Sequence, residues 1–127
     1  MASGRGLVLL IEDDDDLREV AAGILQRAGF RVVTAAEGQE ALQKVAEEMP
    51  QVVFLDMKMP GMDGWAFARE FRARHADAAP IVVLTAAANA QARADEVDAD
   101  DVLGKPFEAR DFIAMAERHV NRGTQAP

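Results

Sequence analysis

The chain has 127 residues, no cysteine and a formal net charge of −8. This length suits a single domain that can bury roughly two-thirds of its unfolded surface. Without cysteine there are no disulfides and no thiolate metal site, which fits a reducing compartment. The sequence has no apolar run of about 18 residues and no signal-peptide pattern, so we expect a cytoplasmic protein with no membrane contact. The negative charge argues against direct binding to nucleic acid and favours basic partners or cations.

Short apolar runs alternate along the chain with segments of helical spacing. The runs predict buried strands at 7–11, 31–36, 51–55, 81–84 and 101–104. The apolar faces of four predicted helices are Leu17, Val20, Ala21, Ile24, Leu25 and Ala28; Ala41, Leu42, Val45, Ala46 and Met49; Phe67, Ala68 and Phe71; and Ala109, Phe112, Ile113, Ala116 and Val120. Segment 90–97 is helical by propensity, although Val97 is its only large apolar residue.

This alternation predicts a single α/β domain. Five strand–helix units imply a parallel sheet with helices on both faces and right-handed crossovers. The flavodoxin-like, doubly wound strand order 2-1-3-4-5 is expected at this size, with a ligand site beyond the carboxyl ends of strands 1 and 3. We expect the domain to span 7–120, after a flexible tail at 1–6. Residues 121–127 are predicted to be a second flexible tail or the start of a linker.

The reactive side chains of the sequence fall at the ends of the predicted strands. They are Glu12 and Asp13 after the first strand, Asp56 after the third, Thr85 after the fourth and Lys105 after the fifth. Three carboxylates at one edge would repel one another by about 4 kcal/mol per pair at 4 Å and an effective dielectric near 20. A hard divalent cation such as Mg²⁺ relieves this repulsion. The three carboxylates with a bound cation, the ammonium of Lys105 and the hydroxyl of Thr85 together suit phosphoryl transfer onto a carboxylate.

Four motifs in order resemble the receiver domain of two-component response regulators. They are VLLIEDD (8–14), FLDMKMPGMDG (54–64), VVLTAA (82–87) and LGKPF (103–107). The resemblance implies a signalling domain that catalyses only its own phosphorylation and dephosphorylation. Asp56 would accept the phosphoryl group from the phosphohistidine of a histidine kinase or a histidine phosphotransfer protein. A downstream protein or output domain would bind the face formed by 90–97, 101–104 and the last helix.

The resemblance also implies a metal site. Asp13 and Asp56 would be side-chain ligands of Mg²⁺, with Mn²⁺ as an alternative ion, and the main-chain carbonyl of Lys58 would be a third ligand. Glu12, where the family more often has aspartate, would act through a metal-bound water. The ammonium of Lys58 is expected to pair with the acids when no metal is bound.

The remaining family roles concern the switch. Thr85 resembles the switch hydroxyl, Lys105 resembles the phosphate-binding lysine, and the bond between Lys105 and Pro106 resembles the family's cis peptide. Val102 stands where the family usually has tyrosine or phenylalanine, and Asp98 where it usually has glycine. Thr85 and Lys105 are 20 residues apart, about two fewer than the family pattern, so we expect an altered switch and a weakly docked segment at 86–98.

Other polar and bulky residues have ordinary structural interpretations. We expect helix caps at Asp14, Asp15 or Asp16 and at Asp63; packing for Met57, Met59 and Met62; a half-buried Trp65; and surface positions for His75 and His119.

Two alternative functions stay open on the sequence. A phosphohydrolase of the haloacid dehalogenase type also forms an aspartyl phosphate, but its nucleophile follows the first strand in a D-x-D arrangement. A receiver-like module that binds partners constitutively, with vestigial phosphorylation, fits Val102 and the short 86–98 segment, whereas the retained acids, threonine and lysine argue against it.

Overall fold

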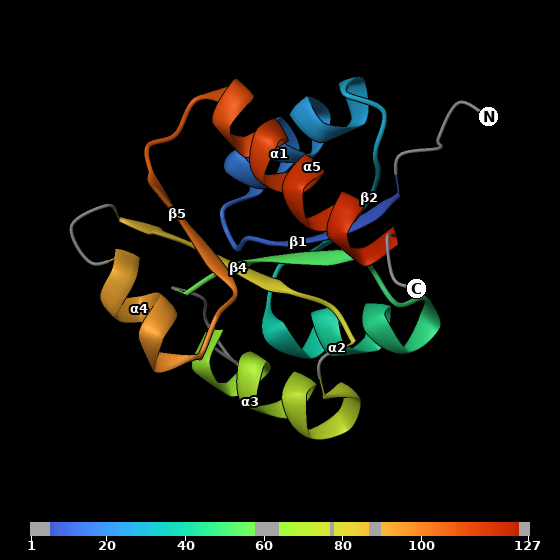
Figure 1. Ribbon diagram of the computed structural model, residues 1–127, viewed down its shortest axis with the longest axis vertical. Coiled ribbons are helices and arrows are strands. Elements are labelled where there is room, and N and C mark those ends of the chain that lie inside the picture. The colour runs from blue at the N-terminus through green and yellow to red at the C-terminus, as the bar shows by residue number, and fades with distance from the viewer. Residues whose placement is uncertain (1–5, 58–63, 77, 87–89, 125–127) are drawn as a thin grey trace.

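A computed structural model of the chain describes residues 6–57, 64–76, 78–86 and 90–124. Strands and helices alternate through these residues, as the sequence predicts (Figure 1). The elements are β1 (Leu7–Ile11), α1 (Asp15–Arg27), β2 (Arg31–Ala35), α2 (Gly38–Glu47), β3 (Val52–Asp56), α3 (Gly64–His75), β4 (Ile81–Ala86), α4 (Ala90–Glu96), β5 (Asp101–Lys105) and α5 (Ala109–Thr124).

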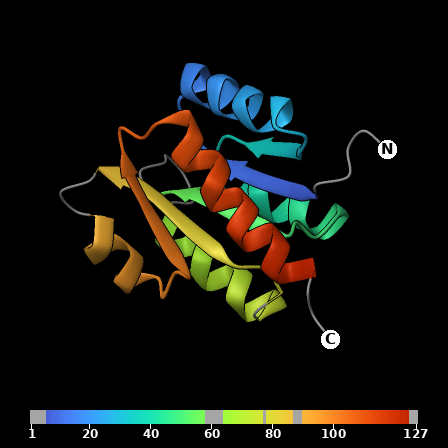
Figure 2. The same ribbon diagram turned by 45° about the horizontal axis from the view of Figure 1, so that its top comes forward.

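The strands form one parallel sheet in the order β2-β1-β3-β4-β5, which confirms the predicted doubly wound topology. Helices α1 and α5 cover one face, and α2, α3 and α4 cover the other (Figures 1 and 2). The chain first moves outward from β1 to β2 and then returns past β1 to β3. The carboxyl ends of β1 and β3 therefore meet at the point where the direction of winding changes, which is where such sheets bind ligands.

The core has two layers because the central strands are buried on both faces. Leu9 and Leu55 face α2, α3 and α4, whereas Leu10 and Phe54 face α1 and α5. The ring of Phe54 meets that of Phe112 on α5 edge to face, with centroids 4.8 Å apart. This geometry is favourable for aromatic pairs and anchors α5 to the middle of the sheet.

Helix α1 differs from the prediction in its first turns. Leu17 and Val20, expected in the core, are 49% and 59% exposed. Later in the helix the prediction is confirmed, since Leu25 is buried and Ala21, Ile24 and Ala28 pack against the core, together with Ala22. Leu17 and Val20 lie on the same stripe as Ile24 and Ala28, so the difference concerns the start of the helix and not the face that it buries.

Helix α5 differs from the prediction at both ends. Its first residue, Ala109, is exposed, and the helix continues to Thr124, beyond the boundary predicted at 120. His119, expected on the surface, is 1% exposed. Its Nε2 lies 3.1 Å from Oδ2 of Asp101, the first residue of β5. A buried polar ring needs such a partner, so this contact explains how histidine occupies the inner face of α5.

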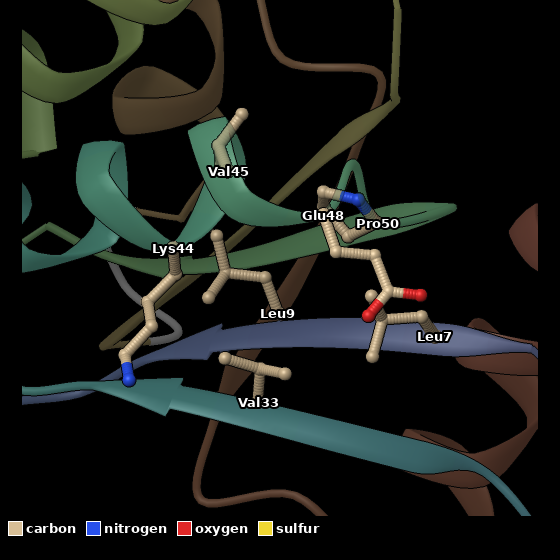
Figure 3. A pocket seen from close by; sticks show the side chains of 7 residues that line it. All are labelled: Leu7, Leu9, Val33, Lys44, Val45, Glu48 and Pro50. Atoms are coloured by element: carbon tan, nitrogen blue, oxygen red, sulfur yellow. The ribbon is translucent and has the colours of Figure 1, made fainter.

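A shallow hollow lies between α2 and the first two strands (Figure 3). Its walls are formed by Leu7, Leu9, Val33, Lys44, Val45, Glu48 and Pro50. Leu7 begins β1, so the hollow is near the amino ends of the strands and away from the predicted site.

Across the described residues, no helix combines the length and the apolar character needed to cross a membrane.

Candidate functional site

Two buried acids meet where β1 and β3 end. Ile11 and Leu55 are paired in the parallel register, so Glu12 and Asp56 are the next residues along two neighbouring strands. The main-chain N–H of Glu12 donates to the carbonyl of Ala35 at 3.0 Å, which ties this position to the end of β2. Glu12 is 4% exposed and Asp56 is 5% exposed. Their carboxylates are therefore largely removed from water, where a negative charge requires compensation.

Asp13 completes an acidic cluster with these two residues. Carboxylate oxygens from Glu12, Asp13 and Asp56 all lie within 4.8 Å of one another, and Asp13 is the exposed member. Oxygen ligands at this spacing suit a hard divalent cation, with the exposed side left for water or for a ligand. The structure thus brings together the three acids that the sequence singled out.

Lys105 supplies a positive charge to this cluster. At the end of β5, its Nζ lies 2.9 Å from Oε1 of Glu12 and 3.8 Å from Oδ1 of Asp56. The other oxygen of Glu12, Oε2, accepts the main-chain N–H of Asp14 at 3.3 Å. Within the part of the chain that the structure describes, Lys105 contributes one ammonium to three carboxylates, and a cation can neutralise the remaining negative charge of these residues.

Thr85 lies on β4, and Val102 lies on β5, the strand that ends at Lys105. The Cα of Leu84 pairs with that of Asp56, so Thr85 is one residue further along β4, at the same edge, and it is half-buried. Val102 on β5 pairs with Val83, is half-buried, and packs against the core layer on the α4 side. The peptide bond between Lys105 and Pro106 is cis.

Asp98 shows why its position favours glycine. It follows α4 with φ of +54°, in the left-handed region. Aspartate tolerates this conformation better than most residues with a Cβ, because its short polar side chain bonds locally.

The structure describes some of the remaining residues for which the sequence predicted a role near the site, and others lie outside the described part of the chain. Asp14 caps α1, since its Oδ1 accepts the N–H of Leu17 at 3.0 Å, and Met57 is buried as predicted. Trp65 is half-buried. The predictions for Lys58, Met59, Met62 and Asp63 lie outside the described residues.

Sequence reasoning missed several side-chain links between distant elements, and two of them involve residues that the sequence analysis had considered. Trp65 at the start of α3 donates from Nε1 to Oε1 of Glu96 on α4 at 2.7 Å. The second link joins His119 to Asp101. Helical spacing could have revealed the buried histidine, because His119 lies about two turns after Phe112 and next to Val120 on the same stripe. The spacing of Trp65 and Glu96 carries no such signal.

The comparison with protein families identifies the class. The family model for the response regulator receiver domain matches residues 8–117. The chain belongs to this family, and its motifs, strand order and acidic strand ends agree with that assignment. It is a receiver domain of two-component signalling, in which phosphorylation switches the binding of partners.

Individual relatives include longer regulators. The chain is 36% identical over 124 residues to the transcriptional regulatory protein GltR of Pseudomonas aeruginosa, covering 95% of this chain and 51% of that protein. It is 38% identical over 124 residues to the transcriptional regulatory protein AfsQ1 of Streptomyces coelicolor, covering 91% of this chain and 52% of that protein. The chain therefore spans about half the length of these relatives.

Solved structures agree with this fold. The receiver domain of NtrX from Brucella abortus has a TM-score of 0.82 and 32% identity, with 90% of this chain and 98% of that chain covered. The chemotaxis protein CheY4 of Vibrio cholerae has a TM-score of 0.79 and 31% identity, with 89% of this chain and 97% of that chain covered.

Proposed function

We propose that Asp56 is the phosphoacceptor of this receiver domain and that a histidine kinase or a histidine phosphotransfer protein is the donor. The observation that carries this proposal is the buried carboxylate of Asp56, which has Lys105 at 3.8 Å and two further carboxylates close by. A carboxylate held at the end of a central strand has a fixed direction, and the exposed side of the cluster gives a donor access to it.

The transfer is a substitution at phosphorus. An oxygen of Asp56 forms the new P–O bond, the P–N bond of the phosphohistidine breaks, and the imidazole takes that electron pair and leaves as a neutral ring that keeps the proton on its other nitrogen. Lys105 neutralises charge on the phosphoryl oxygens, and the hydroxyl of Thr85 donates a hydrogen bond to one of them. The product is an acyl phosphate, and its hydrolysis by water returns the free carboxylate. The domain thus catalyses only its own phosphorylation and dephosphorylation.

The acidic cluster fits Mg²⁺, with Mn²⁺ as an alternative. Asp13 and Asp56 would be direct ligands, Glu12 would act through a water, and the main-chain carbonyl of Lys58 would complete the protein ligands. Hard oxygen donors and excess negative charge are what such an ion requires. When bound, the ion supplies positive charge that stabilises the phosphoryl oxygens during transfer.

The surface next to the site suits a protein donor. Leu17 and Val20 are exposed on the first turns of α1, which begins directly after the acidic strand end. Exposed apolar side chains beside a reactive carboxylate offer a contact that a small-molecule donor would not use. We expect Val20→Glu to slow transfer from a phosphorylated histidine kinase and to leave labelling by acetyl phosphate unchanged. Equal slowing with both donors would contradict this role for α1.

The output is proposed to use the face formed by α4, β5 and α5. GltR and AfsQ1, whose names identify them as transcriptional regulators, are about twice as long as this chain. We propose that phosphorylation acts on transcription through a separate domain or partner protein. The net charge of −8 disfavours direct contact between this domain and nucleic acid.

Labelling with acetyl phosphate and Mg²⁺ tests the phosphoacceptor. The wild type should gain one phosphoryl group that hydroxylamine removes. Asp56→Asn should keep the circular dichroism spectrum and lose the label, whereas Asp16→Asn, which changes an exposed acid on α1, should keep it. A hydroxylamine-sensitive label of undiminished amount on Asp56→Asn would refute the assignment.

A further inference from the structure

The side chains of helix α4 that the structure describes bury little apolar surface. Ala94 on the helix and Val97 just after it are buried, with 4% and 8% exposure. Gln91, Asp95 and Glu96 are exposed. One alanine and one valine bury far less apolar surface than the aromatic residues of α3, so polar links contribute a larger share of the docking of α4.

Two side chains on the same face of helix α3 form hydrogen bonds with α4 and with the turn after it. Trp65 donates to Glu96 at 2.7 Å, and Nη2 of Arg72 donates to the carbonyl of Asp98 at 2.9 Å. Trp65 and Arg72 are about two helical turns apart, so they project from one side of α3. In Figures 1 and 2, α4 lies beside α3 on the same face of the sheet.

The link through Trp65 begins next to the phosphoacceptor. Asp56 is followed by the buried Met57, against which Gly64 packs closely. A Cβ placed on Gly64 would lie 2.9 Å from Cα of Met57, so the backbones on either side of the 58–63 segment are in tight contact. Trp65 is the next residue, and its indole holds Glu96. Short contacts therefore join Asp56 to α4 through the start of α3.

We propose that the hydrogen bond between Trp65 and Glu96 docks α4 on α3 and transmits displacement at the phosphoacceptor to α4. The second half of this proposal rests on the proposed phosphorylation of Asp56. It provides a route to the output face that is separate from Thr85 and Val102. Because valine is short and has a single stiff rotatable bond, it is a poor two-state element, and a second route matters in this chain.

Hydrogen exchange in the unphosphorylated protein tests the docking. Loss of a charge-assisted hydrogen bond at an exposed position should raise the opening equilibrium of α4 about three- to tenfold. Glu96→Ala should therefore speed amide exchange in α4 by that factor. Asp95→Ala is the matched control, since it removes the same charge from α4 and breaks only the bond between Gln91 and Asp95 within the helix. Equal exchange rates in the two variants would overturn the proposal.

Beryllofluoride with Mg²⁺, which mimics the phosphoryl group, tests the coupling. Trp65 is the only tryptophan, so its indole N–H gives a single NMR signal. We expect loading to shift this signal and to change α4 exchange in the wild type and in Asp95→Ala. In Glu96→Ala, loading should remain and the change in α4 should be lost. If Glu96→Ala responds like Asp95→Ala, the coupling is refuted and the proposed function stands.

If the wild type does not load at all, the proposed function fails, and the coupling fails with it. The exchange comparison in the unphosphorylated protein then still decides the docking. A double-mutant cycle with Trp65→Phe completes the test, because the effects of the two substitutions should be non-additive if the residues bond to each other. Full additivity would contradict a direct link.

Discussion

Asp13→Asn should stabilise the metal-free domain while weakening its binding of Mg²⁺. Asp13 has carboxylate neighbours in Glu12 and Asp56, with oxygens within 4.8 Å. At that separation one pair of charges repels by about 0.9 kcal/mol in water and about 3.5 kcal/mol at a dielectric of 20. Asp13 is exposed, so the lower value applies to each of its two pairs. Attraction to Lys105 offsets part of this sum, which leaves a gain of about 1 kcal/mol.

Thermal unfolding in chelator measures this gain. A stabilisation of about 1 kcal/mol corresponds to a rise in Tm of about 4 °C for a domain of this size. Adding Mg²⁺ should raise the Tm of the wild type and have much less effect on the variant, because only a state that binds the ion is stabilised by it. Asp16→Asn, an exposed acid outside the cluster, should leave both values nearly unchanged. If Asp13→Asn lowers the metal-free Tm more than Asp16→Asn does, Asp13 has a structural role and the repulsion argument is wrong.

Three further predictions concern the surrounding structure. Lys105→Gln should lower the free energy of unfolding in metal-free urea by about 1.5–3 kcal/mol, because a buried carboxylate loses its charged partner. The same variant should bind Mg²⁺ more tightly in a calorimetric titration. Unchanged affinity would show that the lysine does not compete with the ion. Gly64→Ala should lower the free energy of unfolding by about 1–3 kcal/mol, because its Cβ would overlap Met57. Gly23→Ala should not destabilise the domain, because the nearest contact of its Cβ is at 3.4 Å on a flexible arginine side chain. Equal effects of the two substitutions would contradict the close approach of Gly64 to Met57. Burial raises the pKa of Asp101, but hydrogen bonds from the N–H of Val102, His119 and Arg118 outweigh it, so the pKa lies below its ordinary value of 3.8. The contribution of ionised Asp101 to the free energy of unfolding is therefore fully present above about pH 4. It is lost as the pH falls through the lower pKa that Asp101 has in the folded state. Asp101→Asn should lose less stability on acidification than the wild type, and parallel pH profiles would refute this.

The strands and the acids that follow them could be predicted because each depends on short-range pattern, and the strand order was expected as the common solution for five strand–helix units. A run such as 7–11 is buried on both faces of a parallel sheet, so it is apolar throughout, and the residues after it must lie at the carboxyl edge. Glu12, Asp13, Asp56 and Lys105 therefore meet wherever this topology forms, and the observed cluster follows from it.

The sequence by itself determined the strands and the residues at their carboxyl ends, whereas only tertiary packing decided which helical residues are buried and which charges pair. Leu17 and Val20 satisfy helical spacing with Ile24 and Ala28, yet they are exposed, because the first turns of α1 do not pack against the core as its later turns do. Glu96 is held by Trp65, 31 residues away, because α3 and α4 pack on the same face. Such contacts depend on side-chain reach across elements, and no local periodicity encodes that distance.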